Sequence, residues 1–173
     1  MALIRRRPRS EGPVRSTDFE LIEHDWFAHA EFEGELREGP VVVPLVRLLQ
    51  DRAELENRPD LGVRVPSDTR LEALTPFVGW LARVEIEFPK FTDGRGYSLG
   101  RRLRDQAGFT GELCAVGDVL RDQALYLHRS GFDVLAIPAY KRAEDTLRAF
   151  DEMSVQYQAA HDQTLPLYKR ASR

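Results

Sequence analysis

The sequence predicts an α/β fold of repeated βα units, with a mainly parallel sheet of about four to five strands in a layered or half-barrel-like arrangement. Three observations predict this fold. Short apolar runs recur along the chain, stretches with apolar residues at helical spacing separate them, and a glycine directly follows two of these stretches. Strands that alternate with single helices favour parallel pairing through right-handed crossovers, so the sheet is expected to be mainly parallel.

The first expected strand is the run Val41 to Val43. Pro44 can occupy the first turn of a helix that continues to about Arg58. Four further strands are expected at 62–65, 83–88, 112–116 and 134–137. In the second of these, Glu85 and Glu87 alternate with apolar residues. This pattern indicates either a strand with one polar face or a strand near the edge of the sheet.

Helices are expected between and after these strands. Apolar spacing predicts them at about 71–81, from Asp118 to Gly131, and past Pro138 to about residue 160. A further helix is expected at about 97–107, where Gly108 would follow its end. Asp68 and Asp118 are cap candidates at the starts of two helices. Gly108 and Gly131 have the residue type that commonly follows the last residue of a helix.

The amino-terminal residues have a different composition. Residues 1–16 are expected to form a flexible basic arm, because they contain five arginines, two prolines and a glycine but no periodic apolar face. Residues 17–173 are expected to form a single α/β domain. Their content of apolar and charged residues is ordinary for a globular protein, so this part should fold by itself.

Composition excludes several classes of protein. The formal net charge of -3 disfavours a nucleic-acid partner, which would call for a basic excess. Cys114 is the only cysteine, so one chain forms no disulfide and no four-thiolate metal or iron–sulfur site. No run approaches the roughly 18 apolar residues that span a bilayer, and arginines follow Ile4 directly. We therefore expect a cytoplasmic protein without a membrane segment, and homo-oligomerisation is left open.

Polar loops follow the last four expected strands. In a parallel sheet the ligand crevice lies at the carboxyl ends of the strands, so these loops should meet at one edge. We call this edge the rim and define it as residues 66–68, 89–98, 117–118 and 138–142.

The loop at 89–98 predicts an anion site. Gly94 and Gly96 would let the backbone approach a ligand closely, and Ser98 and the first amides of the next helix could bind an oxyanion beside Arg95. Lys90, Arg121, Lys141 and Arg142 could add positive charge to the same rim. The alternative is structural: the glycines allow turns, the polar residues cap the helix, and the arginines are solvated. A dinucleotide fingerprint is discounted, because five residues separate Gly94 from the strand end at Phe88.

Candidate catalytic residues on these loops are Asp93, Tyr97 and Asp118, although a helix cap is the favoured interpretation of Asp118. The four histidines show no metal-type pairing, so no metal site is expected. His128 and Cys114 are expected to be packed structural residues, since one lies within a helix and the other within a strand.

Several motifs resemble a known bacterial family. They are the segment from Phe88 to Ser98, followed by Arg101, Leu103 and Arg104, then Gly111 to Leu113, Ala115 to Gln123, and Gly131 to Asp133. Together they resemble a family of unknown function whose members are described as oxidoreductases involved in sulfite reduction. The likeness covers about residues 62 to 138. Cys114 departs from the pattern, in which this position tends to be arginine.

The resemblance implies a place in sulfur assimilation, because members of the family accompany assimilatory sulfite reductase and phosphoadenylylsulfate reductase. It transfers no catalytic residue and no cofactor. One cysteine does not ligate the iron–sulfur cluster that accompanies sirohaem, so the chain is expected to be an accessory component and not the reductase. Two hypotheses remain: a binding or assembly partner of these enzymes whose rim recognises an oxyanion or an acidic protein surface, and a small oxidoreductase with a soluble cofactor.

Overall fold

The computed structural model describes residues 1–7, 14–23, 26–28, 36–56 and 58–170. Within these residues one sheet contains the strands β1 Ala2–Arg6, β2 Phe19–Ile22, β3 Phe27–Ala28, β4 Val41–Pro44, β5 Leu61–Pro66, β6 Arg83–Phe88, β7 Glu112–Gly117 and β8 Val134–Ile137. The helices are α1 Leu45–Gln50, α2 Arg52–Leu55, α3 Arg95–Asp105, α4 Ala124–Arg129, α5 Ala143–Arg148 and α6 Leu167–Arg170. The 3-10 helices are η1 Ser16–Asp18, η2 Leu71–Ala73, η3 Thr75–Phe77, η4 Arg121–Gln123 and η5 Ala149–Asp151.

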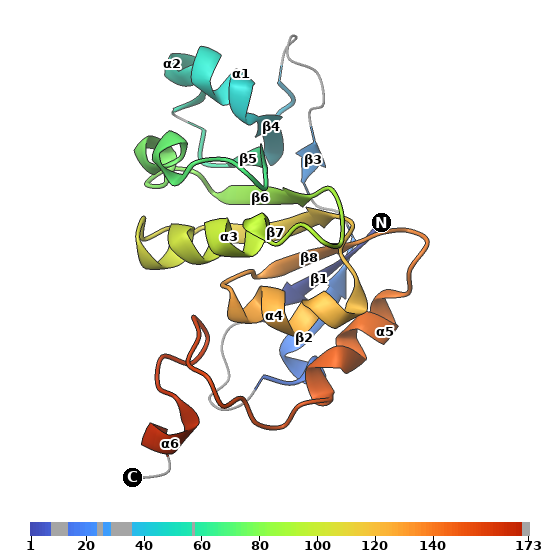
Figure 1. Cartoon of the computed structure of the whole chain (residues 1–173). Helices are drawn as coiled ribbons and strands as arrows, with labels where there is room; N and C mark the ends of the chain where they lie inside the picture. The colour runs from blue at the N-terminus through green and yellow to red at the C-terminus, as the bar shows by residue number, and fades with distance from the viewer. Residues whose placement is uncertain (8–13, 24–25, 29–35, 57, 171–173) are drawn as a thin grey trace.

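The described strands are hydrogen-bonded in the order β2-β1-β8-β7-β6-β5-β4-β3 (Figure 1). Strands β3 to β8 pair in parallel, and β1 is antiparallel to both β2 and β8. The α/β class and the mainly parallel sheet are confirmed. The expected count of four to five strands is too small, because β1, β2 and β3 lie in a part of the chain where no strand is predicted.

The prediction of a flexible arm is wrong for residues 2–6. These residues form β1, in which Leu3 and Ile4 are buried. Arg5 donates from Nε to Glu112 at 2.7 Å, so one of the arginines that suggested an arm is used in an ion pair with β7. Residues 8–13 of the predicted arm lie outside the described residues.

The sheet is curved. Ile22 ends β2 and Phe27 begins β3, and these strands lie at opposite ends of the strand order. Five Cα steps span at most about 18 Å, whereas seven strand spacings in a flat sheet would separate the outer strands by about 34 Å. The sheet must therefore curl enough to bring the end of β2 within about 18 Å of the start of β3.

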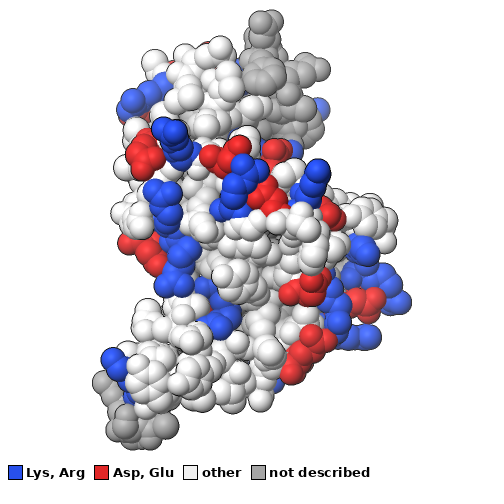
Figure 2. All heavy atoms as spheres, in the orientation of Figure 1, with Lys and Arg blue, Asp and Glu red and all other residues white. Residues whose placement is uncertain are grey.

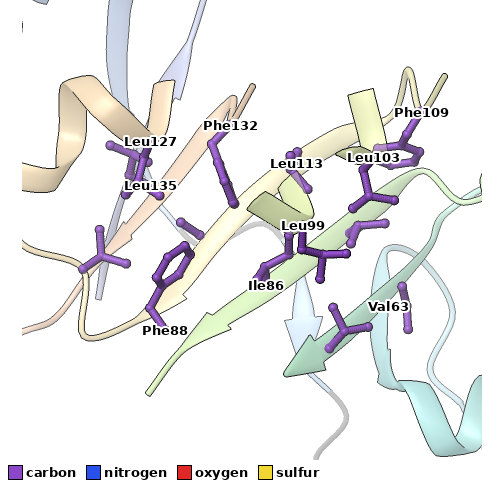
Figure 3. Close-up of a cluster of buried hydrophobic side chains, with 14 of the residues drawn as sticks. Val63, Ile86, Phe88, Leu99, Leu103, Phe109, Leu113, Leu127, Phe132 and Leu135 are labelled. Carbon is purple, nitrogen blue, oxygen red and sulfur yellow. The ribbon is translucent and has the colours of Figure 1, made fainter. Parts of the chain in front are cut away.

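Helices α3, α4 and α5 lie on one face of the sheet (Figure 1). Figure 3 shows Leu99 and Leu103 of α3 among the inward side chains of the strands, including Ile86 and Leu113. Gly100 allows this close approach, because a Cβ atom there would lie 2.5 Å from the ring of Phe132. The main apolar core therefore lies between the sheet and these helices.

The opposite face of the sheet holds a smaller apolar cluster and a set of charged side chains. Leu3, Cys114 and Val134 belong to the apolar cluster. Arg83 and Glu85 of β6 point to the same face and are buried. The predicted polar face of this strand is thus confirmed, but the alternative of a position near an edge is wrong, because β6 lies between β5 and β7.

Two predicted helices differ from the observed elements. The segment 71–81 contains η2 and η3 with no α-helix; Pro76 lacks a backbone N–H and disfavours a continuous helix. The last predicted helix ends at Arg148 and passes into η5, whereas it was expected to reach about residue 160. Gly108 and Gly131 follow α3 and α4 with φ of 67° and 100°, as their predicted role requires. Over the described part of the chain, none of the helices combines the length and apolarity needed to span a bilayer.

Candidate functional site

Asp118 joins three loops of the rim. One oxygen of its carboxylate accepts the backbone N–H of Phe91 at 3.1 Å, and the other accepts the hydroxyl of Tyr140 at 3.1 Å. These partners follow β6 and β8, whereas Asp118 itself directly follows β7. The prediction that Asp118 caps a helix is wrong, since the next helical turn, η4, begins at Arg121 and its N-cap residue is Leu120. Asp118 instead fixes the loops relative to one another.

Asp93 and Arg95 form a second cluster on the rim. The carboxylate of Asp93 accepts the backbone N–H of Arg95 at 3.1 Å, and it accepts Nε at 3.0 Å and Nη2 at 2.8 Å. Ser67 donates its hydroxyl to the same carboxylate at 2.7 Å, and Arg95 Nη1 reaches Asp68 at 3.2 Å. These hydrogen bonds, first those from the Arg95 side chain and then that from Ser67, hold the pKa of Asp93 well below its usual range. A carboxylate held in this way is a poor general base.

The predicted anion-binding residues do not converge on one point. Arg95 is exposed but is shared between two carboxylates. Gly94 is exposed, and a Cβ atom there would meet nothing within 4 Å. Gly96 is buried against the ring of Phe88, where a Cβ atom would lie 2.6 Å away, so its role is helix packing. Ser98 is exposed and lines a pocket beside α4. The oxyanion site stays a prediction, and it would require an anion to compete with Asp93 and Asp68.

Basic residues that were expected to add positive charge to the rim are also engaged. Arg121 pairs with Glu152 and donates to the carbonyl of Asp145 at 2.9 Å. Arg142 lies 3.9 Å from the carboxylate of Asp145. Figure 2 shows acidic and basic side chains lying side by side over much of this face of the molecule. The rim is therefore a surface of mixed charge and does not concentrate positive charge alone.

Tyr97 packs against aromatic side chains of β6 and α4. Its ring packs at 5.2 Å from the ring of Phe88 and at 4.9 Å from that of Tyr126 of α4. Burial raises the pKa of the Tyr97 hydroxyl, and a hydrogen bond with Gln123 partly offsets this effect. The three predicted catalytic residues therefore belong to separate environments, and they do not form one acid–base cluster.

Sequence reasoning missed the exposed aromatic side chains of the rim. Phe91 is 46% exposed and Tyr140 is 71% exposed. Lys141 holds its ammonium group 5.5 Å from the centre of the Tyr140 ring. Gln123 supports the same region by donating to the carbonyl of Phe91 at 3.3 Å. An aromatic residue within a polar loop after a strand was the available signal for Phe91, but contacts with Gln123 and Asp118 depend on tertiary structure.

His128 and Cys114 have the structural environments that the sequence predicts. His128 is buried, with its ring edge-on to Phe19 at 5.5 Å. Burial lowers the pKa of His128 to about 4. Cys114 is fully buried, and burial raises the pKa of its thiol. In the described part of the chain, no three or more His, Cys, Asp or Glu side chains are grouped so that they could hold a metal ion.

Comparison with known proteins identifies a family. Residues 62–168 match the model of a family described as bacterial protein of unknown function (DUF934). No curated protein and no solved structure matches the chain. The matched residues include the whole rim together with α3, α4 and α5, whereas β1 to β4 lie before them.

Proposed function

Because the chain belongs to the DUF934 family of bacterial proteins of unknown function, we propose its function from the rim and from the sequence resemblance. The protein is an accessory component of assimilatory sulfate and sulfite reduction. It docks through the rim on a sulfite-reducing enzyme, either sulfite reductase or phosphoadenylylsulfate reductase. The resemblance to proteins that accompany these enzymes supports the choice of partner.

The observation that carries the docking proposal is the pair of hydrogen bonds at Asp118. They link the loops that carry Phe91 and Tyr140, and both aromatic side chains remain exposed. Large aromatic side chains are enriched at protein interfaces and often supply most of the binding energy. Loops that are already linked lose less conformational freedom on binding, which favours affinity.

The ion pairs of Arg95 favour a protein partner over a free oxyanion. Asp68 and Asp93 already balance its charge, so a small anion would have to displace a carboxylate. A protein surface can instead form alternating contacts with both the acidic and the basic residues of the rim. Oxyanion binding at Gly94, Arg95, Gly96 and Ser98 is therefore the less favoured form of the proposal.

The alternative function is that of a small oxidoreductase with a soluble cofactor. Asp93 and Asp118 are both engaged in hydrogen bonds that organise loops, and the Tyr97 ring packs against that of Tyr126. These engagements favour a binding role over an acid–base role for the rim. The absorbance spectrum of the purified protein tests this alternative, since a bound cofactor that is a chromophore would be visible in it.

The test is affinity purification of the tagged full-length chain from bacteria grown on sulfate as the sole sulfur source. We expect sulfite reductase or phosphoadenylylsulfate reductase to co-purify with the wild type. The Phe91→Ala and Tyr140→Ala variants should each recover several-fold less of that enzyme, as expected for interface anchors. Tyr168→Ala, which removes another exposed tyrosine, in α6, is the matched control and should behave as wild type.

Two outcomes would overturn the docking proposal. One is that neither enzyme is enriched over an untagged strain. The other is that the rim variants and Tyr168→Ala recover the same amount of the enzyme, since binding would then use another surface. A chromophore that copurifies stoichiometrically with the chain would favour the oxidoreductase alternative instead.

A further inference from the structure

A pocket of about 570 Å³ lies beside α3, away from the clusters around Asp93 and Asp118. Its walls come from α3, from the end of α4 and from residues 158–160 of the carboxyl-terminal segment. Pockets of roughly 300 to 1,000 Å³ are the usual size for small-molecule ligands. The space is therefore large enough for a small organic molecule.

The charged residues that line this pocket are all basic: Arg101, Arg102 and Arg129. Arg101 pairs with Asp105 on the same helix, and Arg102 lies 3.5 Å from Glu72. The carboxylate partners of both arginines are exposed, unlike the mostly buried Asp93 that holds Arg95. Exposed ion pairs contribute little free energy, so an anion can compete for Arg101 and Arg102. Figure 2 shows basic side chains gathered over α3 on the left of the view.

Arg129 has a different role in the pocket. It is mostly buried, and it lies 3.4 Å from Asp162 and 3.1 Å from the side-chain oxygen of Gln156. It also donates to the backbone carbonyl of Gln158. Arg129 therefore fastens the segment that forms one wall of the pocket to α4, and the pocket is formed before any ligand arrives.

Aromatic rings and hydroxyl groups complete the lining. Tyr97 and Tyr126 lie with their rings 4.9 Å apart, and Tyr126 is 60% exposed. An exposed tyrosine face can stack with a planar ring, as aromatic side chains do with the bases of nucleotides. Ser98 and Ser130 also line the pocket and supply hydroxyl groups for hydrogen bonds.

We infer that this pocket binds a nucleotide. Its phosphate groups would bind Arg101 and Arg102, and its base would stack on Tyr126. A nucleotide combines the two features that the lining favours, because it carries an anionic group and a planar ring. The site does not involve Gly94 or Gly96, and it is independent of the proposed docking function.

The test is isothermal titration calorimetry of the full-length chain with ADP, pyrophosphate and adenosine. ADP should bind more tightly than either fragment, since only ADP satisfies both the arginines and the tyrosine. Arg101→Ala and Arg102→Ala should each weaken ADP binding by about tenfold, the usual effect of losing a charge-assisted hydrogen bond. Tyr126→Ala should weaken ADP but not pyrophosphate, and Tyr126→Phe should restore ADP binding because it keeps the ring.

Arg148→Ala is the matched control, since Arg148 is an exposed helical arginine outside the pocket. It should bind ADP as wild type does, and thermal denaturation should show that every variant is folded. The inference is overturned if millimolar ADP produces no binding heat. It is also overturned if pyrophosphate binds as tightly as ADP, or if the pocket variants weaken ADP no more than Arg148→Ala does.

Discussion

Arg83 Nε lies 3.2 Å from a carboxylate oxygen of Glu112, and the Arg83 side chain is fully buried on the face of the sheet opposite the helices. The ring of Trp26 lies 5.1 Å from the centre of the same guanidinium group. Glu85 lies 3.7 Å from Arg83 and also accepts two hydrogen bonds from Arg64. A chain of ion pairs thus crosses the face of the sheet opposite the helices and links β1, β5, β6 and β7.

This arrangement predicts that Glu85→Gln destabilises the protein by about 3 kcal/mol, because removing one partner of a buried ion pair leaves the remaining charge uncompensated. Urea denaturation measures the change. Glu87→Gln is the control on the same strand, since Glu87 is less buried and should change the free energy of unfolding by less than about 1 kcal/mol. Equal effects of the two substitutions would show that the ion pairs contribute nothing specific.

The burial of Ile4 in strand β1 predicts that Ile4→Ala lowers the free energy of unfolding by about 2 to 5 kcal/mol, as for other fully buried aliphatic side chains. Arg7→Ala, at an exposed position just after β1, should have little effect. Denaturant unfolding of both variants checks the comparison. A loss near zero for Ile4→Ala would support the flexible arm that the sequence suggested.

Helix α3 predicts that Gly100→Ala is destabilising although alanine favours helices. The added methyl group would lie 2.5 Å from the buried ring of Phe132, and overpacking of this kind costs about 1 to 3 kcal/mol. Gly79→Ala is the control, because a Cβ atom at Gly79 meets nothing within 4 Å. It should leave the melting temperature unchanged or slightly raised. A neutral Gly100→Ala would contradict the observed packing of α3.

The burial of His128 predicts that the stability of the protein falls as the pH is lowered from 6.5 towards 4. Burial, followed by the charge of Arg6, lowers the pKa of His128 to about 4, whereas an unfolded histidine has a pKa of about 6.5. The unfolded state therefore binds more protons in this range, and up to roughly 3 kcal/mol of stability present above pH 6.5 is lost as the pH falls.

Urea denaturation between pH 7 and pH 5 measures this effect before the carboxylates are protonated. Asp93 has a lowered pKa, so its contribution is lost only at a more acidic pH. The His128→Gln variant should lose most of the pH dependence in this window. An unchanged slope in that variant would assign the effect to another group.

The ion pairs of Arg95 predict how the rim responds to oxyanions. Since Asp93 and Asp68 hold its guanidinium group, sulfate should raise the melting temperature of wild type and of Arg95→Ala by the same amount. Sulfate stabilises proteins generally, so the comparison between the two chains at equal ionic strength is the informative one. A larger gain in wild type would establish the anion site that the loop sequence suggested.

Much of the fold could be predicted from local patterns. Apolar runs and alternation with a period of two predict the strands at 62–65 and 83–88, and the glycine at position 108 marks the end of α3. These signals are local, because the geometry of a strand or a helix dictates which neighbouring side chains share a face. Strand β1 was not predicted because arginines directly follow its short apolar run, and its pairing with β2 and β8 depends on distant parts of the chain.

The candidate site shows the same division. The sequence by itself determined that Asp93, Arg95 and Asp118 follow strands of a parallel sheet and so belong to one edge. Only the tertiary structure decided that Asp118 joins Phe91 to Tyr140, that Asp93 and Asp68 hold Arg95, and that Tyr97 turns towards Tyr126. These pairings join residues far apart in the chain, so they depend on how the sheet and its loops pack, which no local periodicity encodes.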